Sequence, residues 1–196
     1  GLVGSEMCIR DSDRYNVKAT FFVTNGKPDY QNLIAQEAQR GHTVAIHSAS
    51  HDYAKIYQSV DAYFADFDEM NSIITAQTGK AADLVRFPGG SSNTISKKYC
   101  YGIMSQLVCA VEERGFRYCD WNVSSGDAGG TTSTSQVVAN VIEGIKSNNV
   151  SVVLQHDIKN FSVDAVEQII QWGLSEGYTF LPMTSTTPMS HHGVNN

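Results

Sequence analysis

The strongest constraint on the fold is a regular alternation of short apolar runs with longer amphipathic segments. Runs rich in β-branched and aromatic residues are followed by apolar residues three and four positions apart, the spacing of a helix packed on a sheet. We predict strands at residues 19–23, 43–46, 84–85, 116–123, 151–154 and 178–181, and helices at 30–40, 60–78, 97–114, 135–147 and 161–176. This alternation indicates an α/β fold with a parallel sheet, either open or closed into a barrel.

Local signals add detail to two of these helices and one strand. Ser59 is a favourable N-cap and Gly79 a favourable end for the helix at 60–78. Asp29 and Gly41 play the same parts for the helix at 30–40. The run at 151–154 is expected to be buried on both faces of its sheet.

Composition places the chain among globular proteins and excludes several classes of partner. Its 196 residues, 41% of them hydrophobic, can form one domain with a substantial core. A formal net charge of -6 gives no electrostatic basis for binding nucleic acid or an anionic membrane. No apolar run is long enough to span a bilayer, and no signal-peptide pattern opens the sequence. The cysteines form no C-x-x-C pair, so we expect single buried thiols, with one disulfide among Cys100, Cys109 and Cys119 left open.

The first dozen residues do not fit the alternation that follows them. Met7 to Ser12 resembles the translation of a sequencing adapter, so we exclude residues 1–12 from the fold prediction as a non-native segment. A genuine N-terminal tail is the alternative. We predict one domain at residues 13–183 and a floppy polar tail at 184–196, to whose histidines we assign no role.

Two histidines directly follow the run at 43–46. His47 and His51 are separated by Ser48, Ala49 and Ser50, which are small enough to leave room for a ligand. On a helix or a tight helical turn, positions i and i+4 lie on one face, so both imidazoles could reach one metal ion. The alternative is that two polar residues lie by chance in a surface loop, because a bare H-x-x-x-H pattern has a high false-positive rate.

Four chemically capable side chains fall at or just after predicted carboxyl ends of strands: His47, Arg86, Trp121 and His156. In parallel α/β folds, ligands bind at this edge. We therefore expect the imidazoles of His47, His51 and His156 to surround one small cleft. Simpler interpretations stay open: Arg86 as a surface residue, Trp121 as a core residue and His156 as a hydrogen-bonded core histidine.

These residue types favour metal-assisted hydrolysis. A bound divalent ion lowers the pKa of its water and polarises a carbonyl oxygen. A catalytic zinc usually has three protein ligands, so the chain is one ligand short, and no general base stands at a strand end. Asp52 and Asp157, which adjoin His51 and His156, are candidate substitutes, and solvated loop carboxylates are the simpler interpretation.

Four ordered segments resemble the polysaccharide deacetylase family, with its NodB-homology domain of carbohydrate esterase family four. They are Lys18 to Val23, His47 to His51, Arg86 to Gly89 and Leu154 to Asp157, and the similarity extends over residues 13–181. The resemblance implies a distorted (β/α)7 barrel of the glycoside hydrolase/deacetylase type. The family's first motif, Thr-Phe-Asp-Asp-Gly, is absent before the first segment. We therefore expect a fragment without the first strand, the catalytic base and the third metal ligand.

The resemblance also implies catalytic roles for individual residues. His47 and His51 match the metal-binding histidines, and His156 matches the general acid that protonates the leaving amine. Arg86 matches the arginine that holds the catalytic aspartate.

Other residues match or replace substrate-binding positions of the family. Leu154 matches the apolar residue that lines the acetyl pocket, and Trp121 is a substrate-binding candidate in the fourth motif. Gly89 stands where the family has a tyrosine whose backbone N–H stabilises the oxyanion, a role that glycine can fill. Asp127 or Asp120 is the candidate for the carboxylate that tunes the catalytic histidine.

The resemblance implies a metal-dependent hydrolase that removes N-acetyl groups from an amino-sugar polysaccharide. Peptidoglycan N-acetylglucosamine of the bacterial cell wall is the expected substrate, ahead of chitin-type oligomers and acetylated xylan. Zinc is the expected metal, with cobalt or nickel as alternatives. We expect a monomeric parent protein that is extracellular or in the cell envelope, and little or no activity in this chain. A carbohydrate-binding pseudoenzyme of the same fold and a metal-dependent amidase on a related barrel are the alternatives.

Overall fold

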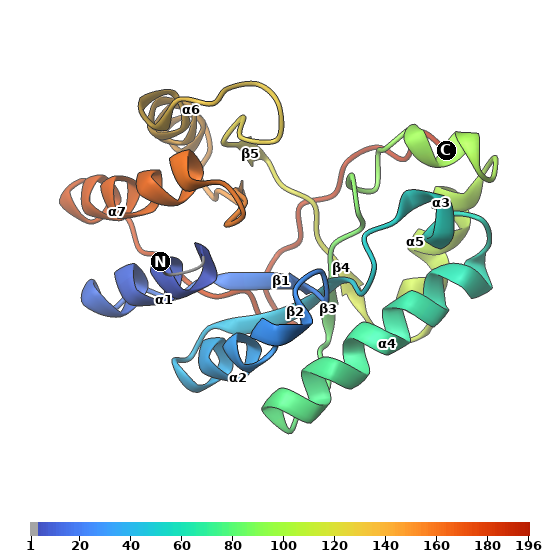
Figure 1. Cartoon of the computed structure of the whole chain (residues 1–196). Helices are drawn as coiled ribbons and strands as arrows, with labels where there is room; N and C mark the ends of the chain where they lie inside the picture. The colour runs from blue at the N-terminus through green and yellow to red at the C-terminus, as the bar shows by residue number, and fades with distance from the viewer. Residues whose placement is uncertain (1–3) are drawn as a thin grey trace. The chain divides into compact units, whose positions relative to one another are not determined.

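The computed structural model describes residues 4–196. The chain divides into two compact units (Figure 1). The larger unit consists of Thr20–Asp120 and Met183–Asn196, and the smaller unit of Gly1–Ala19 and Trp121–Pro182.

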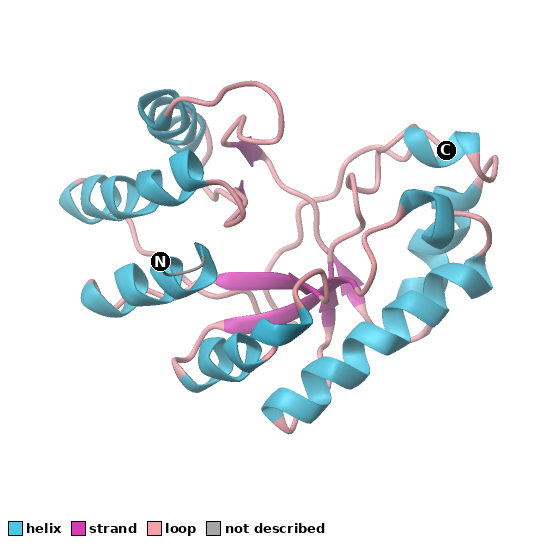
Figure 2. Cartoon of the chain, in the orientation of Figure 1, coloured by secondary structure: helices cyan, strands magenta, loops and turns pink. Residues whose placement is uncertain are grey.

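The larger unit is built on a parallel four-stranded sheet, drawn as magenta arrows in Figure 2. Its strands are β1 (Thr20–Thr24), β2 (Thr43–Ser48), β3 (Leu84–Val85) and β4 (Arg117–Tyr118), in the order β1-β2-β3-β4. Each strand therefore lies beside its predecessor in the chain, as β/α units joined by helices require. The predicted α/β fold with parallel strands is confirmed.

Helices pack against this sheet and provide most of the core. They are η1 (Pro28–Tyr30), α2 (Asn32–Gln39), α3 (Tyr53–Ile56), α4 (Val60–Thr78), η2 (Ile95–Lys98) and α5 (Ile103–Glu113). Both α2 and α4 contact β2, and Figure 1 shows α2 lying below this strand. Fully buried side chains from the sheet and from α4 form one core cluster, among them Ile46, Phe67, Met70, Ile74 and Val85.

The ends of two helices test the predicted capping signals. The Ser59 hydroxyl accepts a hydrogen bond from the Ala62 N–H at 3.0 Å, and Gly79 closes α4 at φ 77°. The prediction for this helix is confirmed. The prediction that Asp29 caps the next helix is wrong. A 3₁₀ turn that starts at Pro28 precedes α2, so Gln31 is the N-cap.

The smaller unit contains α1 (Gly4–Arg14), β5 (Val123–Ser124), α6 (Thr134–Lys146), β6 (Val153–Leu154) and α7 (Asn160–Ser175). The two strands pair in parallel. The helices α6 and α7 share a core of Val137, Val141, Ile145, Ala165 and Ile169. The predicted strand at 116–123 is thus two strands of two different sheets.

Two further strand predictions are wrong in the smaller unit. β6 is half-buried, because it has a single neighbouring strand instead of a sheet covered on both faces. Residues 178–181 form no strand, because their aromatic rings pack back onto α7. The rings of Tyr178 and Trp172 lie 5.3 Å apart, and the Phe180 ring occupies the space beside Gly173.

Residues 4–12, which the fold prediction excluded, form most of α1, where Ile9, Asp11 and Ser12 are buried. The Tyr15 hydroxyl, just past this helix, donates to Glu167 of α7 at 2.7 Å. Residues 1–3 lie outside the described residues, and the non-native origin of the segment stays a prediction.

The polar tail at 184–196 is ordered, contrary to the expectation. The His191 ring stacks on the Tyr118 ring with 3.9 Å between centroids. Asn196 is 7% exposed, and its side-chain oxygen accepts from the Gly102 N–H at 2.7 Å, at the start of α5. Backbone and side-chain hydrogen bonds therefore fix this segment on the larger unit.

All four cysteines are free thiols; Cys119 is buried as expected, whereas Cys109 is exposed. Among residues 4–196, no helix combines the length and the apolar character needed to cross a bilayer.

Candidate active site

The histidine pair lies at the carboxyl end of β2. His47 is part of this strand, and His51 follows it in a loop with a left-handed φ of 52°. The predicted helical turn is therefore wrong. A sharp turn nevertheless brings the rings together, with 5.0 Å between their centroids and 45° between their planes. The Ser48 hydroxyl accepts from the His51 N–H at 2.9 Å and fixes the turn.

A buried carboxylate from α4 holds this turn, and no local sequence pattern marks it as part of the site. Asp66 is 2% exposed and accepts hydrogen bonds from the Ala49 N–H and the Ser50 N–H, both at 2.8 Å. The hydroxyls of Ser48 and Ser50 also donate to it, each at 2.5 Å. Burial acts to raise the pKa of Asp66, but these four donors outweigh it and lower the pKa below its usual value. Asp66 is therefore an ionised anchor for the residues between the histidines.

The backbone of β3 fixes the tautomer of His47. Its Nδ1 lies 2.7 Å from the Arg86 carbonyl oxygen. Because a carbonyl can only accept, Nδ1 carries the proton and Nε2 carries the lone pair that a metal ligand needs. The ring nitrogens of His51 have no hydrogen-bond partner among residues 4–196.

The chemistry and tautomer of this pair fit a divalent ion, but the pair supplies only two ligands. Among residues 4–196, no group of three or more histidine, cysteine, aspartate or glutamate side chains could hold a metal ion. A catalytic zinc site usually has three protein ligands. The donor set in the described residues is therefore a partial one.

Arg86 follows β3 and is a buried residue, so the surface interpretation is wrong. It is 7% exposed, and its guanidinium donates to the carbonyl oxygens of Cys119 at 2.9 Å and Asp120 at 2.8 Å. It also lies 4.1 Å from the centroid of the Phe22 ring. Burial lowers the pKa of Arg86. Its implied role toward a catalytic aspartate stays a prediction.

The loop after Arg86 presents a backbone donor. Gly89 and Gly90 adopt φ of 79° and 80°, in the left-handed region that favours glycine. The Gly89 N–H has no acceptor among residues 4–196. The Tyr57 hydroxyl supports the loop on one side by donating to the Pro88 carbonyl oxygen at 2.6 Å.

Asp120 supports the same loop on the other side. Its buried carboxylate accepts from the Ser91 N–H at 2.8 Å, from the Ser91 hydroxyl at 2.5 Å and from the His192 N–H at 2.9 Å. The tail and the glycine loop are thus joined through one carboxylate. These contacts leave Asp127 as the candidate partner of His156.

In the smaller unit, β5 and β6 bring Asp127 and His156 together. His156 Nδ1 lies 2.8 Å from one Asp127 carboxylate oxygen, and the His156 N–H donates to the other at 2.7 Å. The Ser162 hydroxyl, from α7, donates to the same carboxylate at 2.6 Å. Because a carboxylate accepts, Nδ1 carries the proton and Nε2 is the outward nitrogen of a side chain that is 37% exposed. His156 is therefore oriented by a carboxylate, as a general acid–base residue requires.

The charge of Asp127 is expected to stabilise the fold. Burial acts to raise its pKa, but the hydrogen bonds from His156 and Ser162 outweigh burial and hold the pKa at about 2. The pKa of Asp127 in the folded chain is lower than its ordinary pKa of about 3.8. The charge of Asp127 therefore stabilises the fold fully above pH 3.8, and this stabilisation is lost as the pH falls through about 2. We predict that Asp127→Asn lowers the free energy of unfolding by about 2 kcal/mol at pH 7.

Urea unfolding of both proteins between pH 7 and pH 2 tests this prediction. The difference between them should shrink as the pH falls from about 4 to about 2, while Asp164→Asn, an exposed control on α7, should match the native chain throughout. A difference that does not change with pH would show that the charge of Asp127 is not the cause.

The remaining candidates have less specific surroundings. Trp121 and Leu154 are half-buried, the latter in β6. The Asp52 side chain caps α3 by accepting from the Ala54 N–H at 3.0 Å. Asp157 accepts from the Ser5 hydroxyl. The substrate-binding roles of Trp121 and Leu154 stay predictions.

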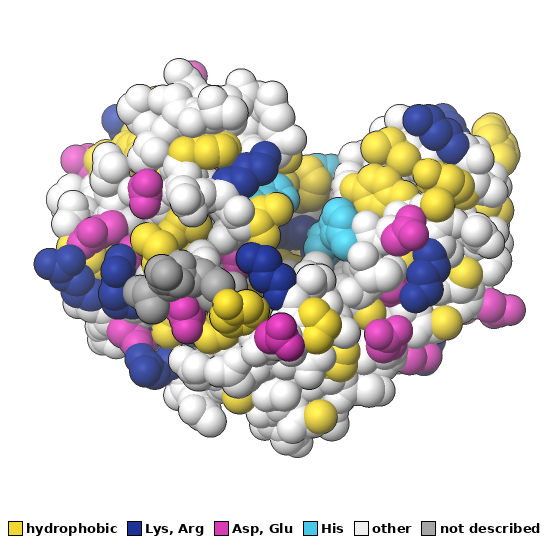
Figure 3. Space-filling model, in the orientation of Figure 1, with side chains coloured by type: hydrophobic (Ala, Val, Ile, Leu, Met, Phe, Trp, Pro, Cys, Tyr) yellow, Lys and Arg dark blue, Asp and Glu magenta, His cyan; other side chains and the backbone are white. Residues whose placement is uncertain are grey.

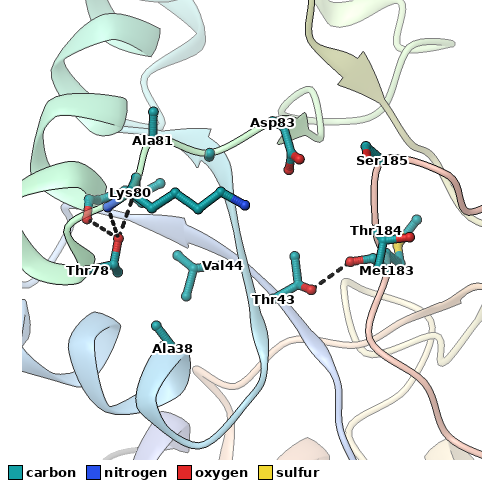
Figure 4. Close-up of a pocket in the computed structure, with 12 residues that line it drawn as sticks. Ala38, Thr43, Val44, Thr78, Lys80, Ala81, Asp83, Met183, Thr184 and Ser185 are labelled. Carbon is teal, nitrogen blue, oxygen red and sulfur yellow. Dashed lines mark hydrogen bonds between the residues drawn. The ribbon is translucent and has the colours of Figure 1, made fainter.

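A cavity of about 360 Å³ lies elsewhere in the larger unit. Its lining includes Thr43 at the start of β2 and Asp83 before β3, and Figure 4 shows Lys80 extending across it. This is the amino edge of the sheet, whereas His47 and Arg86 stand at the carboxyl edge. In β/α folds the amino edge serves stability, so this cavity is not the candidate active site.

Comparison with known proteins decides the family. The family model for polysaccharide deacetylase matches residues 11–101. The catalytic domain of a peptidoglycan N-acetylglucosamine deacetylase from Eubacterium rectale is 66% identical and has a TM-score of 0.98, over 100% of this chain and 90% of that one. The chain belongs to the polysaccharide deacetylase family.

Two further members of the family agree in sequence or fold. A polysaccharide deacetylase structure from Bacillus cereus is 29% identical with a TM-score of 0.80, over 100% of this chain and 91% of that one. The parallel α/β elements of our chain are consistent with the distorted barrel of such deacetylases. A peptidoglycan-N-acetylglucosamine deacetylase of Bacillus cereus is 30% identical over 173 residues, which is 85% of our chain. Our chain spans 60% of the length of that relative.

Proposed function

We propose that this polysaccharide deacetylase chain serves the removal of N-acetyl groups from peptidoglycan N-acetylglucosamine. The observation that carries the proposal is the histidine pair at the carboxyl end of β2. The ring centroids of His47 and His51 lie 5.0 Å apart, and a hydrogen bond to the Arg86 carbonyl oxygen fixes the tautomer of His47. The similarity to domains named as peptidoglycan N-acetylglucosamine deacetylases supports the substrate.

His47 and His51 would hold a divalent ion, and we propose zinc, with cobalt or nickel as alternatives. Such an ion supplies Lewis acidity toward an acyl oxygen. The Gly89 N–H would donate to the same oxygen as negative charge develops on it. Charge on this oxygen is what the transition state of amide hydrolysis must stabilise.

The pair formed by His156 and Asp127 would handle the leaving group. With the base of the family's first motif present, water would lose a proton to that base as its oxygen adds to the acetyl carbon. His156 Nε2 would then donate a proton to the sugar nitrogen as the C–N bond breaks. Asp127 keeps Nδ1 protonated and fixes the ring orientation. The products are acetate and a free amine.

The sequence contains no Asp-Asp pair, so the base and the third metal ligand of the family's first motif are absent from it. We propose that the chain as printed hydrolyses its substrate weakly or not at all. The same observation favours the second candidate function, a carbohydrate-binding protein without chemistry. We further propose a monomer that acts outside the cell or in its envelope.

Acetate release from tetra-N-acetylchitotetraose and from peptidoglycan, measured with added zinc, tests the function. A variant in which residues 1–12 are exchanged for a segment carrying Thr-Phe-Asp-Asp-Gly should release acetate and an equal amount of free amine. The printed chain, and the same variant with Asn-Asn in place of Asp-Asp, should release little.

Two results would contradict the proposal. Equal activity of the printed chain and the Asp-Asp variant would refute the assigned base. Oligosaccharide binding without acetate from any of the three proteins would support the carbohydrate-binding alternative.

A further inference from the structure

The first residue of α3 points its hydroxyl at the glycine loop. Tyr53 Oη lies 3.1 Å from the position that a Cβ atom would occupy on Gly89. The Tyr53 ring also lies beside His51, with 5.5 Å between centroids, and beside Tyr57, with 5.7 Å. The phenol therefore borders both the metal-ligand candidate and the backbone donor.

Because Gly89 has no side chain, the space next to the Tyr53 hydroxyl is left open. A Cβ atom at this position would stand 3.1 Å from Asn93 Cβ and 3.1 Å from Tyr53 Oη, both closer than ordinary contact. The φ of 79° also disfavours any side chain. Glycine and tyrosine thus fit each other across this part of the site.

The Tyr53 hydroxyl makes no hydrogen bond within residues 4–196. Its neighbour Tyr57, by contrast, donates to the Pro88 carbonyl oxygen at 2.6 Å. A phenol hydroxyl is a hydrogen-bond donor as well as an acceptor, so Tyr53 Oη can donate to a ligand. The hydroxyl of a buried tyrosine usually has a hydrogen-bond partner. A bound ligand is therefore the candidate partner of the Tyr53 hydroxyl.

We propose that Tyr53 Oη is a second hydrogen-bond donor to the acyl oxygen of a bound N-acetyl sugar, beside the Gly89 N–H. This inference rests on the proposed function, because it takes the Gly89 loop as the site of the acyl group. It adds a substrate-binding residue from the loop of the histidine pair. Histidine side chains reach the molecular surface on the face drawn in Figure 3.

A titration with tetra-N-acetylchitotetraose, followed through the ¹H–¹⁵N resonances of the printed chain, tests the proposal. In the native chain the Gly89 amide resonance should shift on binding. Tyr53→Phe removes one hydroxyl that has no hydrogen-bond partner in the described part of the chain, so the fold should be kept. The dissociation constant should rise about threefold to tenfold, the usual effect of one lost hydrogen bond.

Tyr101→Phe is the matched control, since this tyrosine is 84% exposed and belongs to the same unit. Its dissociation constant should equal that of the native chain. Equal binding by Tyr53→Phe and the native chain would overturn the role of Tyr53 while leaving the proposed function in place. Absence of any resonance shift with the oligosaccharide would overturn the proposed substrate, and the role of Tyr53 with it.

Discussion

Replacing His156 by alanine in the variant that carries the Asp-Asp segment should lower acetate release by about 10²–10⁴-fold, the usual contribution of a general acid. The amine is a poor leaving group unless it is protonated as the C–N bond breaks. His156 is the side chain whose outward nitrogen can supply that proton, because Asp127 holds the opposite nitrogen at 2.8 Å. Alanine removes the donor without placing another group there.

The control for this prediction is His191→Ala in the same background. His191 is an exposed histidine that stacks on Tyr118 and has no assigned role in the reaction. It should leave acetate release unchanged. If His156→Ala keeps the fold, as judged by thermal unfolding, and retains more than about a tenth of the activity, the assignment of the general acid is wrong.

Asp66→Asn should both destabilise the protein and weaken metal binding. The carboxylate accepts four hydrogen bonds from Ser48, Ala49 and Ser50, and an amide group would turn its NH₂ toward some of those donors. We expect a loss of about 2–3 kcal/mol in the free energy of unfolding, as for other hydrogen bonds to buried charges. Because the turn positions the histidines, zinc affinity should fall by about 10–100-fold, as for other residues that orient metal ligands.

Asp68→Asn is a matched control on the same helix. Asp68 has a side chain that is 53% exposed, and it pairs with Arg114 at 2.9 Å. Exposed ion pairs contribute little, so its effect on stability should stay below about 1 kcal/mol, and zinc binding should not change. Equal effects of the two substitutions would show that α4 is merely sensitive to charge loss and that Asp66 has no special role at the turn.

The order of elements could be predicted from the sequence because its signals are local. Helix α4 shows this best, since Ser59 and Gly79 act on the backbone within one turn of themselves. Pairing of strands is not a local property. Residues 178–181 have strand-like composition, but they pair with no strand, and Phe180 instead packs against Gly173 of α7. The tail was expected to be floppy because nothing near it in the sequence indicates its contacts with Tyr118 and Asp120.

The site shows the same division between local and distant information. The small residues between His47 and His51 indicated a ligand site, but the reason that the turn forms lies at Asp66, in the middle of a helix. A single acidic residue there is not distinguishable by pattern from the exposed Asp68. Sequence alone does not choose between Asp120 and Asp127 as the partner of His156, and the hydrogen bonds from His156 to Asp127 decide it. The convergence of His156 with the histidine pair stays a prediction.

The claim on which the account depends is that His47 and His51 form a metal site, and calorimetric titration of the printed chain with zinc tests it most directly. We predict one ion bound per chain, with binding lost in the double variant His47→Ala, His51→Ala and kept in His191→Ala. Zinc binding that persists unchanged in the double variant would contradict the account.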